Sequence, residues 1–340
     1  MPTFAIDMLW LVWPNSLQTT RRKKKPKDCS RRCIQPILAS QNSTVKDCSV
    51  HIARHLFVVL LASAAFGAQA APLEYPGERP SCTGKSKFPV FDISMPVHTL
   101  SVQNGKKSML DALRDDFKVN TIIRYYDDPD NPTLAGKILK EDESTAILHA
   151  KFKIAVVFQH KSHSVSKFQD GEGTKDAGFA WNLAEKNKQP YKTAIYFGID
   201  GPFEEDELRQ RFGDGKDDEL IGKMRLVVKT YFQEIQAAFA SFAKKEKVPG
   251  YDIGIYCSAE MCSVGDDLKL PHMWVSAAGR DSDYFKKLMA KPAKVNLLQS
   301  RESLPCDGWV GVPHGQDPTF DIDQVNDGNP NLGTWDRKRK

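Results

Sequence analysis

The sequence predicts an α/β fold, a single irregular TIM-like (β/α)8 barrel in which the last strands have shortened or missing helices. Eight apolar, β-branched or aromatic runs recur along the chain, and amphipathic helical patterns separate the first five of them. Strands that alternate with helices require right-handed crossovers and a parallel sheet. Eight such strands within about 240 residues favour a closed barrel over an open sheet.

The predicted strands are near-continuous hydrophobic runs, which is typical of strands buried on both faces. The clearest covers residues 193–200; it ends in Asp200, and Gly201 and Pro202 follow. On its own, Asp200 could be a site residue or only the cap of a turn. The full set is 89–94, 121–127, 152–160, 193–200, 251–258, 272–278, 295–301 and 320–326.

The predicted helices lie between these strands, at residues 108–118, 134–150, 176–188 and 217–247. The last keeps apolar residues at helical spacing, so one of its faces belongs to the core. Beyond the fifth strand the patterns at 259–267 and 280–290 are weaker, and 302–318 is rich in Gly and Pro. No Gly-x-Gly-x-x-Gly follows the first strand, which argues against a dinucleotide site, and we expect no cofactor.

The front of the chain predicts export. Residues 56–66 form a short apolar run that closes on Ala68-Gln69-Ala70, as at a signal-peptide cleavage site, and the run is too short to span a membrane. We therefore expect a signal peptide at 50–70, cleavage after Ala70, and a secreted or periplasmic protein without a stable membrane span. Residues 1–49 are interpreted as a doubtful, disordered upstream extension, 71–87 as a linker, 88–327 as the barrel and 328–340 as a basic tail.

Charge and cysteine content agree with that interpretation. Residues 1–70 hold ten Lys or Arg and three Asp, so the remaining 270 residues have a net charge of −2 and offer no basic surface for nucleic acid. Four cysteines follow the leader and permit three pairings, of which we expect Cys257–Cys262 and Cys82–Cys306. No Cys-x-x-Cys pair or neighbouring His cluster accompanies them, so we expect no metal site.

Polar side chains mark the end of every predicted strand. In a parallel barrel all these ends open on one face, where active sites form. Acids and amides bind sugar hydroxyls and aromatic faces pack on sugar rings, so this rim predicts a carbohydrate cleft. The candidate catalytic residues are Asp200, Asp92 and Asp321, and the candidate substrate-binding residues are Arg124, Tyr126, Gln159, Tyr256, Trp274, Gln299 and Asp323. Glycoside hydrolysis usually needs two such carboxyl groups. His160 and His163, in a polar loop above this face, are expected to form hydrogen bonds or lie at the surface.

Six motifs occur in an order that resembles the glycoside-hydrolase-like domain of unknown function 1906. They are Phe91-Asp92-Ile-Ser94, Ile123-Arg124-Tyr125-Tyr126, Phe168…Gly171-x-Gly173-x-x-Asp176-Ala177, Tyr196-Phe197-Gly-Ile-Asp200, Gly254-Ile-Tyr256-Cys-Ser258 and Phe320-Asp321-Ile-Asp323. The resemblance covers about residues 88–327. That domain is related to the family-25 lysozymes, TIM-like barrels that cleave peptidoglycan. The resemblance implies that Asp92 and Asp200 match the acids ending the first and fourth strands, and that Gln299 and Asp321 match later polar positions.

One departure from the family matters for activity. The lysozymes carry Asp-x-Glu at the fourth strand, with that Glu as general acid, whereas Pro202 stands in its place here. Two main hypotheses follow. The protein is either an exported hydrolase of peptidoglycan or a similar glycan, or a non-catalytic glycan-binding barrel that has lost the acid. A scaffold held at the cell envelope by protein contacts is the third and weaker one.

Overall fold

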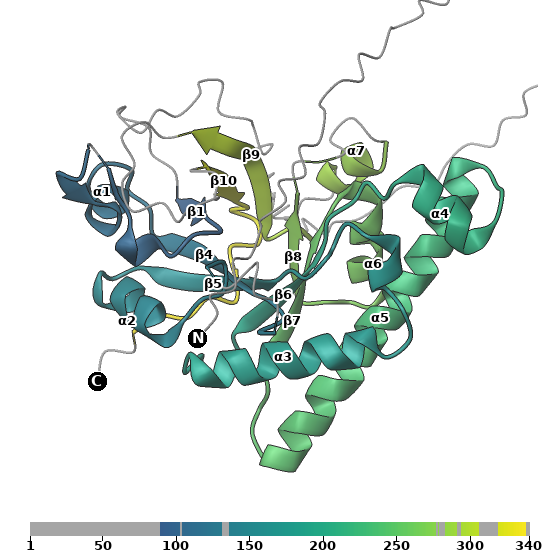
Figure 1. The fold of residues 1–340 in the computed structure, drawn as a ribbon, viewed down its shortest axis with the longest axis horizontal. Helices are drawn as coiled ribbons and strands as arrows, with labels where there is room; N and C mark the ends of the chain where they lie inside the picture. Colours follow the sequence, from purple (N-terminus) through teal and green to yellow (C-terminus); the bar gives the residue numbers. More distant parts are fainter. Residues whose placement is uncertain are drawn as a thin grey trace, which may run out of the picture. The chain divides into compact units, whose positions relative to one another are not determined.

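The computed structural model describes residues 89–102, 104–130, 136–276, 278, 283–290, 294–305 and 319–337. Within these residues eight strands close into a barrel in the order β1-β10-β9-β8-β7-β6-β5-β4 (Figure 1). Every predicted strand forms, so the predicted barrel is confirmed. The strands are β1 (Val90–Asp92), β4 (Thr121–Tyr126), β5 (Lys153–Phe158), β6 (Ala194–Ile199), β7 (Asp252–Cys257), β8 (His272–Val275), β9 (Leu297–Pro305) and β10 (Thr319–Val325).

The direction of the last strand differs from the prediction of a parallel barrel. β10 pairs antiparallel with both β9 and β1, while the other neighbouring pairs are parallel. Pro305 and Thr319 face each other across the β9–β10 pair, so β10 returns from the end at which β9 stops. A parallel connection would need a crossover, usually a helix, and the Gly/Pro-rich segment between these strands is a poor helix former. The beginning of β10, not its end, therefore lies beside the ends of the parallel strands.

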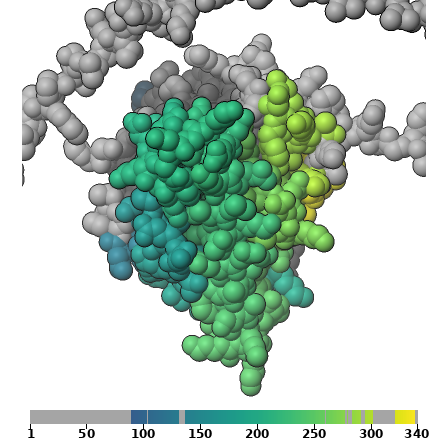
Figure 2. Space-filling model, turned by 90° about the vertical axis from the view of Figure 1, so that its right-hand side faces the viewer, coloured from purple at the N-terminus to yellow at the C-terminus, as the bar shows by residue number. Residues whose placement is uncertain are grey.

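Helices cover the outside of the barrel (Figure 1). They are α1 (Met109–Asp115), α2 (Glu141–His149), α3 (Glu172–Lys186), α4 (Glu205–Phe212), α5 (Asp217–Glu246), α6 (Cys262–Asp267) and α7 (Asp283–Met289). The long α5 buries the apolar face predicted for it, which includes Leu220, Val228 and Phe239. Figure 2 shows one face of this part of the chain, where α4 and α5 form a continuous surface. The predicted helix at 134–150 is shorter than expected, because α2 begins only at Glu141.

Alternate residues of each strand face opposite sides of the barrel wall. The inward side holds Val90, Ile123, Tyr125, Ala155, Val157, Ala194, Tyr196, Tyr256, Trp274 and Leu297, which form one buried cluster. Their strand neighbours, such as Ile122, Tyr126 and Phe197, belong to a second cluster with the helices. This alternation follows from the period of two in a strand. It decides which polar residues at the strand ends share one space.

The segment 329–335 closes the barrel where the parallel strands begin, and we call it the floor. Trp335 pairs with Ile154 through two backbone hydrogen bonds of 2.9 and 3.0 Å, and the Ala194 amide donates to the Gly333 carbonyl at 2.7 Å. The Tyr196 hydroxyl donates to the Leu332 carbonyl at 3.1 Å. The barrel therefore extends beyond the predicted boundary at residue 327, because these residues are part of its packing.

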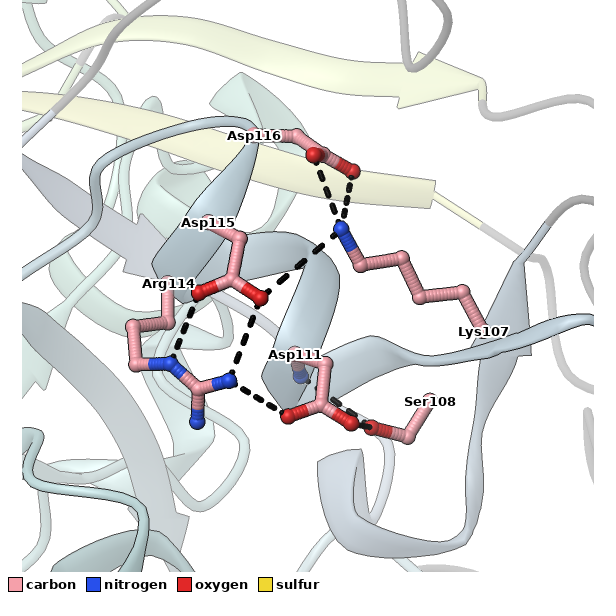
Figure 3. Close-up of polar contacts among 6 residues, drawn as sticks. All are labelled: Lys107, Ser108, Asp111, Arg114, Asp115 and Asp116. Carbon is pink, nitrogen blue, oxygen red and sulfur yellow. Dashed lines mark hydrogen bonds and ion pairs between the residues drawn. The ribbon is translucent and has the colours of Figure 1, made fainter.

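A short hairpin and α1 follow the first strand; β2 (Ser101–Val102) pairs with β3 (Lys107–Ser108). The Ser108 hydroxyl accepts a hydrogen bond from the Asp111 amide at 3.1 Å and so caps α1. Arg114 and Lys107 bind the acids of the same helix at its surface (Figure 3): Arg114 contacts Asp111 and Asp115, and Lys107 contacts Asp116 with both distances 2.8 Å. The Lys107 pair fastens the hairpin to the end of α1, whereas the Arg114 pairs lie within the helix.

The disulfide expected between Cys257 and Cys262 is present, and it joins the end of β7 to the start of α6. Cys82 and Cys306, the second expected pair, lie outside the described residues, as do the predicted signal peptide and linker. In the part of the chain that the structure covers, no helix combines the length and apolar character needed to cross a membrane.

Candidate functional site

Four carboxyl groups lie at inward positions near the ends of the parallel strands, an opening that we call the mouth. Asp92 ends β1, Asp200 follows β6, and Asp321 and Asp323 are the third and fifth residues of β10. Asp92 and Asp321 are partners in the antiparallel pairing of β1 with β10. Residues paired in this way have Cα atoms about 4.5–5.5 Å apart, so these two carboxyl groups are neighbours.

Asp92 is almost completely buried, with an exposed fraction of 1%. Its Oδ2 accepts a hydrogen bond from the Tyr125 hydroxyl at 3.0 Å, whereas its buried Oδ1 has no partner among the residues that the structure describes. Burial raises the pKa of Asp92 well above its ordinary value, and the nearby charge of Asp321 raises it further. The Tyr125 hydrogen bond and the charges of Lys137 and Arg124 oppose this shift without cancelling it. Asp92 is therefore a group that holds a proton more strongly than an ordinary carboxylate.

The two acids of β10 are held by side chains from neighbouring strands. The Gln299 amide donates to Asp321 Oδ2 at 2.9 Å, and the Tyr256 hydroxyl donates to Gln299 Oε1 at 3.0 Å. The Trp274 indole N–H donates to Asp323 Oδ1 at 2.8 Å, while the buried Oδ2 of Asp323 has no partner. Burial raises the pKa of Asp323 well above its usual range, and the charges of Asp92 and Asp321 add to the shift.

Asp200 is connected to a lysine through an amide. Gln159 donates its Nε2 hydrogen to Asp200 Oδ2 at 3.1 Å, and its Oε1 accepts from Lys137 Nζ at 2.7 Å. The ammonium group also lies 4.2 Å from the centroid of the Tyr125 ring, a cation–π contact. Burial raises the pKa of Asp200, and the positive charges of Lys137 and His163 lower it. The peptide bond after this residue, Gly201–Pro202, is cis.

A histidine and an acid lie beside this network. His160 Nδ1 is 2.8 Å from Asp127 Oδ1, which also accepts the Asp128 amide at 2.7 Å. Burial raises the pKa of Asp127, and the His160 contact opposes that shift. The expected hydrogen-bonding role of His160 is thereby confirmed. The His163 side chain acts on the site through its charge near Asp200.

The structure brings most of the predicted site residues into one space. Asp92, Gln159, Asp200, Tyr256, Trp274, Gln299, Asp321 and Asp323 are connected by the contacts above. Trp274 is 1% exposed and its ring centroid lies 4.2 Å from that of Tyr256. These two rings therefore support the acids from beneath, and Trp274 is a support for Asp323 more than a surface for a sugar ring.

Arg124 and Tyr126, which are also predicted to bind substrate, lie apart from the other predicted site residues. Arg124 forms a buried ion pair with Glu143 of α2, at 2.7 Å, and donates to the Ile93 carbonyl. The Tyr126 hydroxyl donates to Gln189 Oε1 at 3.0 Å. Both side chains leave the outer face of β4, because Tyr125 between them takes the inward position.

Two residues of the mouth were missed from the sequence. Tyr125 was overlooked because β4 is apolar or aromatic on both faces, although counting back by two from Asp127 marks it as inward. Lys137 was placed inside a predicted helix that began at residue 134. The acidic run Glu141, Asp142 and Glu143, typical of a first helical turn, could have identified the later start.

This arrangement can provide both an acid and an ionised carboxylate. Neighbouring carboxyl groups in a buried site cannot all ionise easily, so one keeps its proton while another carries charge. Asp92 has the features of the protonated partner, and Asp200 lies in the field of Lys137, whose charge opposes the effect of burial on its pKa. Among the described residues, no group of three or more His, Cys, Asp or Glu side chains is arranged to hold a metal ion.

A comparison with models of protein families places the chain in one of them. A family model described as Rv2525c-like, glycoside hydrolase-like domain matches residues 111–329; this range begins after β1, so Asp92 lies outside it. YbfG of Bacillus subtilis (strain 168), an uncharacterized protein, is 31% identical over 120 residues, which are 35% of this chain and 14% of that protein. The chain therefore matches only a small part of the length of YbfG.

Two solved structures are also similar to the chain. The Tat-secreted protein Rv2525c of Mycobacterium tuberculosis, in complex with L-tartrate, has a TM-score of 0.45 and 15% identity, over 74% of this chain and 100% of that one. The modular autolysin LytC of Streptococcus pneumoniae, in complex with a synthetic peptidoglycan ligand, has a TM-score of 0.36 and 13% identity, over 69% of this chain and 45% of that one.

Proposed function

The chain belongs to the Rv2525c-like family of glycoside-hydrolase-like domains, and from this premise we propose that it is exported and acts on peptidoglycan or a related glycan at the barrel mouth. In this proposal the working groups are the carboxyls of Asp92, Asp200 and Asp321. Gln159, Gln299, Tyr256, Trp274 and Asp323 hold them or bind the glycan. Export rests on the predicted signal peptide.

The observation that carries this proposal is the environment of Asp92. A glycosidase needs one carboxyl group that stays protonated until it reaches the leaving oxygen, and a second that is ionised. Burial and the adjacent Asp321 favour the protonated form of Asp92. Asp92 can then supply the proton that the glutamate missing at Pro202 would have supplied. Asp200 takes the part of the ionised partner in this proposal: burial raises its pKa too, but the nearby charge of Lys137 opposes that shift.

A second function is favoured by Pro202 itself. Because this position cannot donate a proton, the mouth can serve as a binding site for a glycan without cleaving it. The buried Oδ1 of Asp92 and Oδ2 of Asp323 lack donors, and the hydroxyl groups of a sugar are donors of the right kind. In this alternative the ligand is the same class of glycan, but the protein binds the glycan without cleaving it.

Zymography and pull-down on purified peptidoglycan test both functions. We expect wild-type protein to clear the substrate, and D92N and D200N to bind it without clearing it. Asp206→Asn, which changes an exposed acid of α4, is the matched control and should clear normally. Clearing by D200N at the wild-type rate would remove Asp200 from the mechanism. If the wild type retains peptidoglycan without clearing it, the binding alternative is established. If it neither retains nor clears peptidoglycan, both functions are rejected.

A further inference from the structure

Lys137 lies at the mouth because the segment around it pairs with β4, a pairing that is not part of the strand order of the barrel. β1 pairs with β4 only as far as Asp92 and Ile123. Two residues further along β4, Tyr125 forms a parallel bridge with Ile138, and the Leu139 amide donates to the Tyr125 carbonyl at 2.8 Å. The segment around Ile138 thus lies beside β4 beyond the point where β1 ends, and it fixes the residue before it at the rim.

The side chain of Lys137 is held by specific contacts and does not extend into solvent. Its ammonium group donates to Gln159 Oε1 at 2.7 Å and lies 4.2 Å from the centroid of the Tyr125 ring. Each of these partners binds one of the proposed working groups: Gln159 donates to Asp200, and Tyr125 donates to Asp92. Lys137 is therefore connected to both carboxyls through one intervening side chain each.

We propose that Lys137 is a positioning residue of this site, which holds Gln159 against Asp200 and sets the charge state of Asp92 and Asp200 together. The inference rests on the proposed function in taking these two carboxyls as the working groups. Its physical basis is that a buried positive charge favours the ionised form of nearby acids, and that an amide fixed at its oxygen presents its N–H groups in a defined direction.

Among the described residues, four charged groups act on Lys137. They are Asp92 from β1, Arg124 from β4, Asp127 from the end of β4, and Asp200 from the end of β6. Burial lowers the pKa of Lys137, the three acids raise it, and Arg124 lowers it. In the opposite direction, the charge of Lys137 lowers the pKa values of Asp92, Asp127 and Asp200. The lysine is thus the shared positive partner of three acids that burial makes difficult to ionise.

The sign of the expected effect follows directly. Removing the positive charge of Lys137 takes away an influence that lowers the pKa values of Asp92 and Asp200, while burial continues to raise them, so both pKa values should rise. Any reaction or binding step that needs an ionised Asp200 then moves to higher pH by the same amount.

The test is a titration of side-chain carboxyl carbons by NMR in the unliganded protein, with Asp92 and Asp200 assigned from D92N and D200N. We expect K137M to raise both midpoints and Lys137→Arg, which keeps the charge, to leave them near the wild-type values. Lys140→Met removes the same charge from an exposed residue of the same segment and should change neither. K137Q keeps a donor for Gln159 without the charge, so it should also raise both midpoints if K137M does not fold.

Unchanged midpoints in folded K137M or K137Q would overturn the inference, and so would an equal rise in K140M. Because the titration uses no glycan, its outcome is independent of the proposed function. A protein that neither binds nor clears peptidoglycan but shows the expected rise would reject the function and keep the role of Lys137. If the protein does clear peptidoglycan, the pH profile of clearing by K137Q should move upward with the NMR midpoints.

Discussion

The floor and the mouth of the barrel are built from different polar groups: paired backbone groups form the floor, where only the indole nitrogen of Trp335 lacks a partner among the described residues, and carboxyl groups form the mouth. At the floor, backbone groups of the segment 329–335 meet partners: Trp335 pairs with Ile154, and Gly333 accepts from the Ala194 amide. At the mouth, the buried atoms Asp92 Oδ1 and Asp323 Oδ2 have no partner, and neighbouring acids repel one another. A buried acceptor without a donor costs about 1–3 kcal/mol. The comparison indicates that the floor stabilises the fold and that the mouth keeps its unsatisfied groups at the expense of stability.

The largest expected effect is at the floor. Gly333 has a φ of 62°, and a Cβ added there would lie 2.3 Å from the Cβ of Ala194. Gly333→Ala should therefore lower the free energy of unfolding by roughly 3 kcal/mol or more, because backbone strain adds to an overlap that neither side can relieve. Urea denaturation measures the loss.

Gly105 provides the matched control for that substitution. It also has a positive φ, of 82°, but a Cβ there meets nothing within 4 Å. Gly105→Ala should cost only about 1–2 kcal/mol, the strain of the backbone alone. Equal losses at the two glycines would mean that the close approach of the floor to β6 contributes nothing, and the proposed division between floor and mouth would lose its strongest support.

At the mouth, removing a charge should stabilise the protein. Asn at position 323 can still accept the Trp274 hydrogen bond but cannot ionise. Because burial raises the pKa of Asp323 in the folded state, the folded protein binds more protons than the unfolded chain, and its stability falls as pH rises above the unfolded pKa. Asp323→Asn should therefore raise the free energy of unfolding at pH 7 by about 1–2 kcal/mol.

The pH dependence of that gain is its control. The difference between D323N and the wild type should shrink as pH falls, and it should vanish below about pH 4, where the carboxyl is protonated in both states. Denaturation curves at several pH values measure it. A gain that is the same at all pH values would show that packing, and not the charge of Asp323, is responsible.

The same substitution, Tyr to Phe, can be made at the floor and at the mouth, so its effects at the two ends of the barrel can be compared. The Tyr196 hydroxyl donates to the Leu332 carbonyl at the floor, and the Tyr125 hydroxyl donates to Asp92 at the mouth. Tyr196→Phe should cost about 1 kcal/mol of stability and leave action on the glycan intact. Tyr125→Phe removes a contact that lowers the pKa of Asp92, so the midpoint of Asp92 should move upward. If Y196F altered the pH profile of clearing as much as Y125F did, the two ends would not be separable.

The smallest expected effect on the free energy of unfolding is at the surface, away from both the floor and the mouth. It provides a reference for the larger effects. Lys107 forms an ion pair with Asp116, whose side chain is 38% exposed. Exposed pairs of this kind contribute about 0–1 kcal/mol and are screened by salt. Lys107→Met should therefore change the free energy of unfolding by about 0.5 kcal/mol or less, and by less still at high salt. A loss as large as that of Gly333→Ala would show that the global stability is not concentrated at the floor.

The strands could be located from the sequence because both faces of the barrel wall are buried, so each strand is a long apolar run. For the same reason, the sequence does not show which side chains of a strand point into the barrel and which point outward. In β4, apolar or aromatic residues occupy inward and outward positions alike, so nothing in the run itself distinguishes Tyr125 from Arg124 and Tyr126. The acids could be found because an isolated carboxylate at the end of such a run is conspicuous.

What the sequence could not provide depends on contacts between distant parts of the chain. The position of Lys137 depends on a bridge to Tyr125, and the direction of β10 depends on how it closes against β1. The floor was read as a basic tail because the polar residues around Asn329 and Asn331 resemble a solvated end. Their partners, Asn296 and His272, come from the starts of two other strands.

The closure of β10 against β1 and of Trp335 against Ile154 also has a consequence for how the protein folds. Both contacts join segments far apart in the sequence, and loops of this size must be closed before the contacts stabilise anything. Folding rates fall as the mean sequence separation of contacts rises. The barrel should therefore fold slowly and late, with the middle strands β4 to β7 assembling first, and a nascent chain that lacks β10 should remain an open sheet whose edges are β1 and β9.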